Sequence, residues 1–201
     1  SQFNAGFGRG TLGLLSSGDN NSAIGFNALG GLNTGSNNTA NGYNAGATIT
    51  SGSRNTVIGY GAGDGFDTEN DNIAIGYDAL GGAVAGGEKN VVIGNYAGDA
   101  ITSADNTVLL GYEAGSSITS STDSIGIGYQ AGMTMGNQTI AIGSLSASIG
   151  TGWRNVMIGY GAGKRTTDHD NVVIGWEAGD DGTAYGQSVF IGSHAGKRWG
   201  I

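Results

Sequence analysis

The sequence predicts an all-β protein built as a parallel β-solenoid, in which short strands from successive coils stack into one elongated body. A nine-residue phrase recurs eleven times, and at 55–63 it reads Asn-Thr-Val-Ile-Gly-Tyr-Gly-Ala-Gly. The central glycines lie 15–18 residues apart, a regular period that is typical of stacked coils. They are Gly25, Gly42, Gly59, Gly76, Gly94, Gly111, Gly128, Gly143, Gly159, Gly175 and Gly192.

A short strand is predicted just before each central glycine, which is taken as position 0. Position −1 is Ile or Leu in ten of the eleven repeats, with Asn41 as the exception, and position −3 is β-branched in ten, with Ser22 as the exception. Two such positions spaced by two define one face of a strand. We expect this face to line the core of the coil.

Position −2, on the opposite face of the strand, is never polar. A strand buried only by its own coil should alternate apolar and polar residues, so a second cover is needed. The cheapest cover is another copy of the chain. The predicted oligomer interface is Val57, Val92, Leu109, Met157, Val173 and Phe190.

The rest of the coil carries three weaker patterns. A second strand is predicted around position +7, where Leu32, Ile49, Phe66, Ile101, Ile118 and Met135 recur, with Val84 and Ile149 one residue out of phase. Ala at +3 and Gly at +4 suit a tight corner, since Gly adopts positive φ easily. Asn, Ser or Thr at −4 opens every strand and predicts a ladder of hydrogen bonds between coils.

Composition excludes several classes of protein. The chain has 201 residues, 42 Gly, no Pro and no Cys, so neither a collagen helix nor thiolate or disulfide chemistry is available. A net charge of −8 disfavours nucleic-acid binding, and no apolar run is long enough for membrane insertion. We expect a degenerate capping coil at 1–20 and the repeat domain at 21–201.

Position +1 is aromatic in eight repeats and is the strongest candidate for ligand binding, because such a stripe could stack on sugar rings. The alternative is a structural ladder of rings packed between coils or chains. The stripe consists of Phe26, Tyr43, Tyr60, Tyr77, Tyr112, Tyr129, Tyr160 and Trp176.

Two clusters of charge are weaker candidates. The acidic loop at 64–72 could hold Ca²⁺, but its spacing matches neither an EF-hand loop nor the glycine-rich nonapeptide that binds Ca²⁺ in other β-rolls, so a solvated loop is favoured. The basic pairs Lys164-Arg165 and Lys197-Arg198 could form a ledge for an acidic glycan or a neighbouring module, although solvated charges are the simpler interpretation. We expect no metal and no cofactor.

The repeats at 73–76, 140–143 and 172–175, which read Ile-Ala-Ile-Gly or Val-Val-Ile-Gly, resemble the head repeats of trimeric autotransporter adhesins and similar repeats in phage tail fibres. The resemblance covers about residues 21–196. It implies a left-handed β-roll, a homotrimer, adjacent fibre modules and adhesion to a glycan-rich surface, outside the cell or on a virion. The coils here are longer than usual in adhesin heads, and an aromatic residue follows the glycine.

The predicted function is therefore a non-catalytic adhesive fibre or head module. The alternative is a filament that assembles head to tail. An enzyme of the β-helix type is disfavoured because the acidic residues scatter over loops of different phase and form no paired carboxylates.

Overall fold

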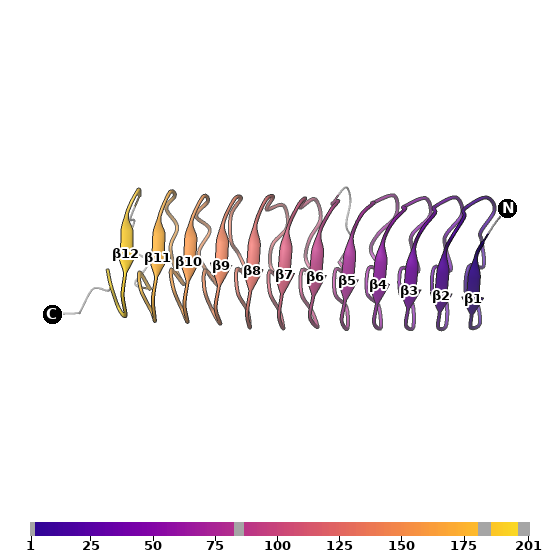
Figure 1. Ribbon diagram of the computed structural model, residues 1–201, viewed down its shortest axis with the longest axis horizontal. Helices are drawn as coiled ribbons and strands as arrows, with labels where there is room; N and C mark the ends of the chain where they lie inside the picture. Colours follow the sequence, from indigo (N-terminus) through magenta and orange to yellow (C-terminus); the bar gives the residue numbers. More distant parts are fainter. Residues whose placement is uncertain (1–2, 83–86, 181–185, 197–201) are drawn as a thin grey trace.

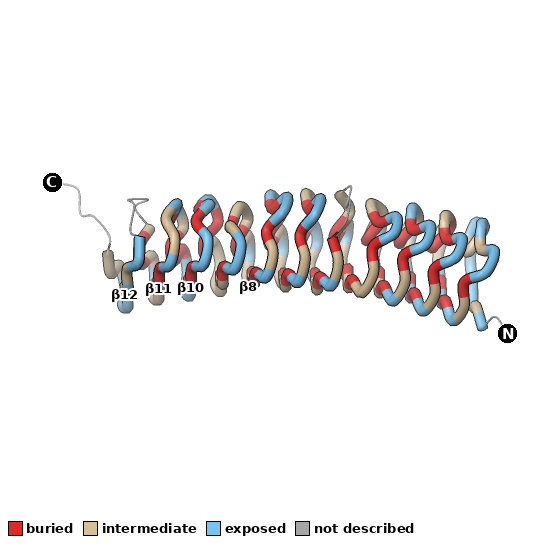
Figure 2. Tube along the Cα trace, turned by 90° about the horizontal axis from the view of Figure 1, so that it is seen from above, coloured by how far each residue is buried: buried red, intermediate tan, exposed pale blue. Residues whose placement is uncertain are grey.

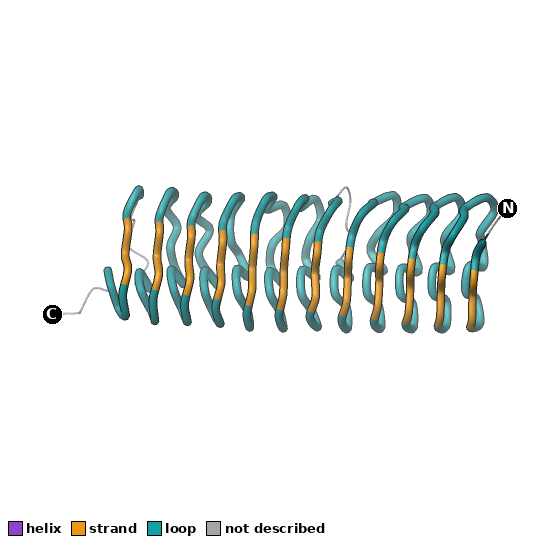
Figure 3. The backbone as a smooth tube through the Cα atoms, viewed as in Figure 1, coloured by secondary structure: helices purple, strands orange, loops and turns teal. Residues whose placement is uncertain are grey.

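The computed structural model describes residues 3–82, 87–180 and 186–196 as a rod built from a single parallel sheet (Figures 1 and 3). Each strand has three residues and pairs only with its neighbours in the sequence. The strands are β1 (Ala5–Phe7), β2 (Ser22–Ile24), β3 (Thr39–Asn41), β4 (Thr56–Ile58), β5 (Ile73–Ile75), β6 (Val91–Ile93), β7 (Val108–Leu110), β8 (Ile125–Ile127), β9 (Ile140–Ile142), β10 (Val156–Ile158), β11 (Val172–Ile174) and β12 (Val189–Ile191).

The predicted fold class, an all-β parallel solenoid, is confirmed. Every strand pairs position for position with the next, so that Val57 stacks between Ala40 and Ala74. One strand was not expected: β1 lies inside the predicted capping segment and pairs with β2 in the same register, Ala5 opposite Ser22. The sequence around β1 lacks the Val/Ile phrase, which is why the repeat pattern missed it.

The interior of the coil is lined by position −2, so the predicted orientation of the strand was wrong. Val57, Val92, Leu109 and Val173 are fully buried within the single chain. Met157 is 1% exposed, and Phe190 packs, partly buried, against the same core. These six residues are therefore core residues and cannot form the interface between chains. The residues at −1 and −3 are partly exposed instead, on either side of the buried residue at −2. Buried segments recur along the whole rod (Figure 2).

Two further columns complete the core. The alanines at +3, for example Ala45 and Ala114, are fully buried, and so are Leu32, Phe66 and Ile101 at +7. The +7 residues form no second strand in the described part of the chain and lie in irregular backbone between turns. Ile149 is 49% exposed, and Val84 lies outside the described residues. The expected second strand was wrong, although most of its residues do line the core.

The predicted ladder at −4 is confirmed and lies inside the coil. Asn38, Asn55 and Asn72 are fully buried. The Oδ1 of Asn55 accepts the backbone N–H of Asn72 at 2.9 Å, while its Nδ2 donates to the carbonyl of Glu69 at 2.7 Å. The same pair of bonds recurs at Asn38, and Thr107, Ser124 and Thr139 replace the amide by a hydroxyl that donates to a backbone carbonyl. Each amide therefore satisfies backbone groups that water cannot reach.

The central glycines are required by close contact between coils. Gly111 has φ of 137°, a conformation that residues with a side chain rarely adopt, and a Cβ there would overlap the carbonyl oxygen of Gly128. Positions −5 and +2 differ, because they have φ near 60°, in the left-handed α region that Asn and Asp tolerate. Asn44 and Asn106 are examples.

Replacement of Asn55 by Ala should lower the free energy of unfolding by about 2–5 kcal/mol, because two buried backbone groups lose their partners. Urea denaturation at a fixed protein concentration measures the change. Thr119→Ala, at an exposed loop position, is the control and should cost less than about 0.5 kcal/mol. Equal effects of the two substitutions would contradict the role of the ladder.

Gly111→Ala should destabilise the protein by about 3–5 kcal/mol, because strained backbone and a steric overlap add together. The matched control is Gly161→Asn, where φ is 61° and the nearest atom to a new Cβ is a flexible side-chain carbon of Glu177 at 3.5 Å. Thermal unfolding should show little change for this control. A tolerated alanine at 111 would disprove the close stacking of the coils.

Candidate functional site

The outward side chains at −3 and −1 of β5 to β12 form one flat apolar surface, here called the outer sheet face. Every one of these positions is Val, Ile or Leu. They are partly to largely exposed: Ile93 is 38% exposed, and Val189 and Ile191 are each 67% exposed. From β2 to β4 the same columns are mixed, with Ser22, Thr39, Asn41 and Thr56. The apolar surface is therefore confined to the last two thirds of the sheet.

The aromatic residues at +1 run beside the outer sheet face in three blocks of stacked rings. In the first block, from Phe26 through Tyr43 and Tyr60 to Tyr77, consecutive ring centroids lie 5.0 Å apart with nearly parallel planes. Tyr112 stacks on Tyr129 at 5.8 Å, and Tyr160 stacks on Trp176 at 4.4 Å. The rings remain about half exposed, with Trp176 at 53%.

This stacking limits what the stripe can bind. Within a block the ring faces cover one another, so a sugar can reach the ring edges and the tyrosine hydroxyls but cannot lie flat on an inner ring. Open ring faces are expected only where a block ends. Sequence reasoning missed these breaks, although they are marked by the nonaromatic residues Asn95, Ser144 and Ser193 at +1.

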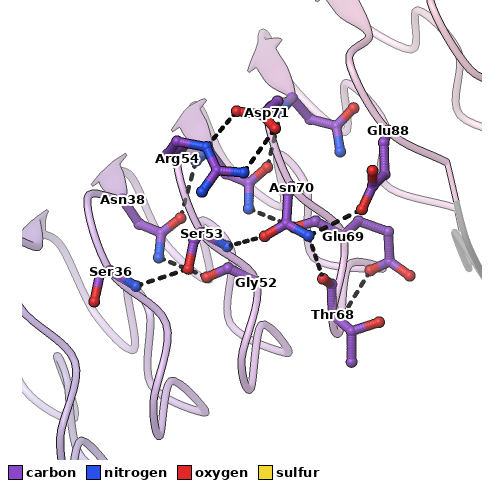
Figure 4. Close-up of polar contacts among 12 residues, drawn as sticks. Ser36, Asn38, Gly52, Ser53, Arg54, Thr68, Glu69, Asn70, Asp71 and Glu88 are labelled. Atoms are coloured by element: carbon purple, nitrogen blue, oxygen red, sulfur yellow. Dashed lines mark hydrogen bonds and ion pairs between the residues drawn. The ribbon is translucent and has the colours of Figure 1, made fainter.

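The corner before each strand carries a second polar column, at position −6 (Figure 4). In several coils the backbone N–H at −6 donates to the −6 side chain of the next coil: Ser36 N–H to the Oγ of Ser53 at 3.0 Å, and Ser53 N–H to the Oδ1 of Asn70 at 2.9 Å. Asn70 in turn donates through Nδ2 to the carboxylate of Glu88 at 2.9 Å. These groups hold neighbouring coils together and leave little free bonding capacity for a ligand.

Charges in the adjacent −5 column are paired along the rod. Arg54 binds Asp71 through two hydrogen bonds of 2.6 and 2.8 Å, and Arg154 binds Asp170 in the same way at 2.5 and 2.8 Å. The hydrogen bonds from Arg54 hold the pKa of Asp71 below its ordinary value of 3.8. Such bidentate pairs fix the register of neighbouring coils.

The acidic side chains of the loop at 64–72 make separate contacts with different partners. The buried carboxylate of Glu69 accepts the backbone N–H groups of Asp67 and Thr68 at 2.5 and 3.0 Å, while Asp71 binds Arg54. Across residues 3–82, 87–180 and 186–196, no three His, Cys, Asp or Glu side chains gather closely enough to hold a metal ion. The acidic side chains of the loop therefore form no such cluster.

The basic pair at 164–165 does not form an isolated ledge. The guanidinium of Arg165 lies 3.4 Å from the carboxylate of Asp180. The second pair, Lys197 and Arg198, lies outside the described residues. Nearby, Trp153 packs edge-on against His169 at 4.6 Å and is covered by the guanidinium of Arg154 at 4.1 Å.

Other acidic groups lack such partners. Partial burial raises the pKa of Asp64, Asp78 and Asp99 above the ordinary value, and Asp78 adds to the shift at Asp64. Glu113 and Asp78 raise the pKa of Asp99 further through repulsion between negative charges. These residues follow their strands at +2 or +5 in four successive coils. The corner after the strands is therefore acidic, in contrast to the paired column before them.

Fold and surface together define a parallel β-solenoid whose exposed features are a flat apolar sheet, stacked aromatic rings and an acidic corner. Comparison with models of known protein families, with curated proteins and with solved structures gave no match. In the part of the chain that the structure describes, no helix is long and apolar enough to cross a membrane.

The stability of the protein should rise as the pH falls from neutral toward the raised pKa values of Asp64, Asp78 and Asp99. Because the folded-state pKa values of Asp64, Asp78 and Asp99 are raised, protonation of these groups favours the folded state, and the gain is lost again as the pH rises through them. The pKa of Asp71 is lowered, so the contribution of this group to stability is present above pH 3.8 and is lost only in stronger acid.

The melting temperature as a function of pH tests this expectation. Asp99→Asn should flatten the rise, whereas Asp123→Asn, which removes the same charge elsewhere, should preserve it. A rise that is identical in the two variants would show that overall net charge, and not the acidic corner, causes it.

Proposed function

We propose that this chain is a non-catalytic fibre or head module that assembles as a homotrimer through the outer sheet face and attaches to a glycan-rich surface outside the cell or on a virion. The observation that carries the proposal is the uncovered apolar face of β5 to β12. Each of its outward positions is Val, Ile or Leu, and apolar side chains on a flat surface favour removal from water.

The size of the outer sheet face supports association of chains. Eight strands stacked at ~4.8 Å span ~35 Å, and the three positions from −3 to −1 add ~10 Å across, so the face covers roughly 350 Å². Three such faces brought together in a trimer bury about 1,000 Å² in all, which reaches the lower limit of stable protein interfaces. Each face is also within the size range of the largest apolar patches that monomers usually expose.

The flatness of the face further favours identical partners. Residues stack in register along the whole rod, so a second chain that lies alongside presents the same spacing of Ile and Val at every level. The number three comes from the resemblance to adhesin heads, in which three solenoids close around one axis. The mixed columns from β2 to β4 leave the first part of the rod less suited to this contact.

Attachment is proposed for the aromatic blocks and for the loops that face away from the strands. Tyrosine hydroxyls and ring edges on a rigid rod offer repeated weak contacts, and repeated contacts on an assembled trimer gain avidity. Neighbouring fibre modules are the other partners expected from the resemblance. Because the aromatic residues recur in blocks along the rod, an extended polysaccharide fits this surface better than a small molecule does.

Light scattering should give a mass three times the 20.0 kDa of the chain at micromolar concentration. A double substitution on the outer sheet face, Ile142→Lys with Ile174→Lys, should release monomers with unchanged β content, because the charged side chains replace outward residues and leave the core intact. The control is Ser103→Lys with Thr119→Lys, at exposed loop positions half a coil from the strands. A monomeric parent protein would refute the assembly.

The assembled protein should bind a subset of glycans on an array, and Tyr60→Ala should weaken the signal without loss of trimer. Absence of glycan binding by an intact trimer would remove the adhesive part of the proposal and leave the assembly. Electron microscopy that shows open-ended fibres in place of discrete rods would favour the alternative, a head-to-tail filament.

A further inference from the structure

The aromatic column is interrupted between β5 and β7. At the level of β6 the +1 position is Asn95, whose Oδ1 accepts the backbone N–H of Tyr77 at 3.0 Å. The aromatic residue is displaced by one position, to Tyr96. Its ring is tilted by 60° to that of Tyr77 at 5.2 Å and stands nearly perpendicular to that of Tyr112 at 6.0 Å. The parallel stack is therefore open here.

A hollow of about 420 Å³ lies at this break, lined by Tyr96, Asp99, Tyr112, Glu113 and Ser116. Tyr96 and Tyr112 contribute partly exposed rings, at 36% and 44%. The polar residues come from positions +2 and +5 of two successive coils, so the rigid stacking of β6 on β7 sets their spacing. Aromatic walls with a few fixed polar groups in a cavity of this size are typical of sites for small ligands.

The polar groups of the hollow are acidic and are not neutralised by the protein. The Oδ1 of Asp99 is buried and has no hydrogen-bond partner. Glu113 accepts a hydrogen bond of 2.6 Å from the neutral amide of Gln130. None of the ion pairs in residues 3–82, 87–180 and 186–196 involves Asp99 or Glu113. Asp99 and Glu113 therefore leave two uncompensated negative charges at the wall of the hollow.

We propose that this hollow binds an organic ammonium group, such as the amine of an amino sugar or of a lysine side chain. The carboxylate charge of Asp99, which lines the hollow, would attract the ammonium. The rings of Tyr96 and Tyr112 would contact the cation and its attached carbons. Glu113 adds a second negative charge, and Ser116 offers a hydroxyl. The inference does not depend on trimer formation or on glycan attachment.

The distribution of charge along the rod supports a cationic ligand over a neutral one. In the −5 column, Arg54 and Arg154 each form an ion pair with an aspartate of the next coil, so these charges are compensated within the chain. At the hollow the chain places carboxylates beside aromatic rings, with no such partner. A neutral sugar would leave the charge of Asp99 uncompensated, whereas an ammonium group compensates it.

Calorimetric titration of the 201-residue protein at pH 7 and low salt tests the proposal with three probes. Glucosamine and Nα-acetyl-lysine methylamide carry the ammonium on a sugar and on an amino-acid side chain, and N-acetylglucosamine is the neutral counterpart. We expect millimolar, saturable binding of at least one amine, with N-acetylglucosamine at least about tenfold weaker. The preferred amine identifies the source of the group.

Matched variants locate the site. Asp99→Asn keeps the shape of the side chain and should lower the affinity for the amine by on the order of tenfold. Tyr112→Phe retains the ring and should bind within about twofold of the parent protein, whereas Tyr112→Leu should bind several-fold more weakly. Tyr43→Leu, in an unbroken block, should have no effect. Near-ultraviolet circular dichroism confirms that each variant is folded.

Equal binding of glucosamine and N-acetylglucosamine would overturn the proposal, and so would failure of both amines to bind at tens of millimolar. Full affinity in Asp99→Asn would place binding elsewhere. Because light scattering reports the trimer separately, failure here leaves the proposed assembly untouched.

Discussion

Stacking of equivalent residues in register is the constraint on which the rest of this structure depends. Each strand contributes three residues, too few to be stable alone, and gains its hydrogen bonds only from the coils before and after it. The buried asparagines make that stacking specific. The side chain of Asn55 binds Glu69 and Asn72 of the next coil, so a shift by one residue would leave an amide and two backbone groups unpaired in the core.

The same constraint explains the surface. Because every side chain lies above its counterpart, chemistry repeated in the sequence becomes a column in space: apolar at −1, aromatic at +1, polar at −6. Alternation of charge within a column stabilises it, as at Arg54 and Asp71, whereas like charges in neighbouring columns repel each other, as at Asp78 and Asp99. A break in a column, such as Asn95, has a local consequence, because neighbouring rings lose a stacking partner and a hollow opens.

The sequence was sufficient for the fold class, the strand positions and the −4 ladder, since all three follow from the repeat. The sequence was not sufficient to tell which face of each strand points into the core, because both faces are apolar. The size of the side chains held the missing information: Ala23, Ala74 and Gly126 at −2 suit a narrow interior, whereas −1 is uniformly bulky. The prediction of a second strand was wrong because Phe66 and Ile101 are buried apolar residues that lie in irregular backbone. The hollow at Tyr96 could not be found from composition, since it arises from the angle between two rings.

Direct access of a reagent to the two faces of one strand tests the orientation on which this account stands. The chain has no native cysteine, so Val92→Cys and Ile93→Cys each introduce a single thiol into β6. Introduced into the Ile142→Lys and Ile174→Lys background, which is expected to be monomeric, the thiol at 93 should react rapidly with a water-soluble maleimide. The thiol at 92 should react only on unfolding. Equal rates in the folded protein, or faster labelling at 92, would contradict the inward orientation of position −2 and the outer sheet face with it.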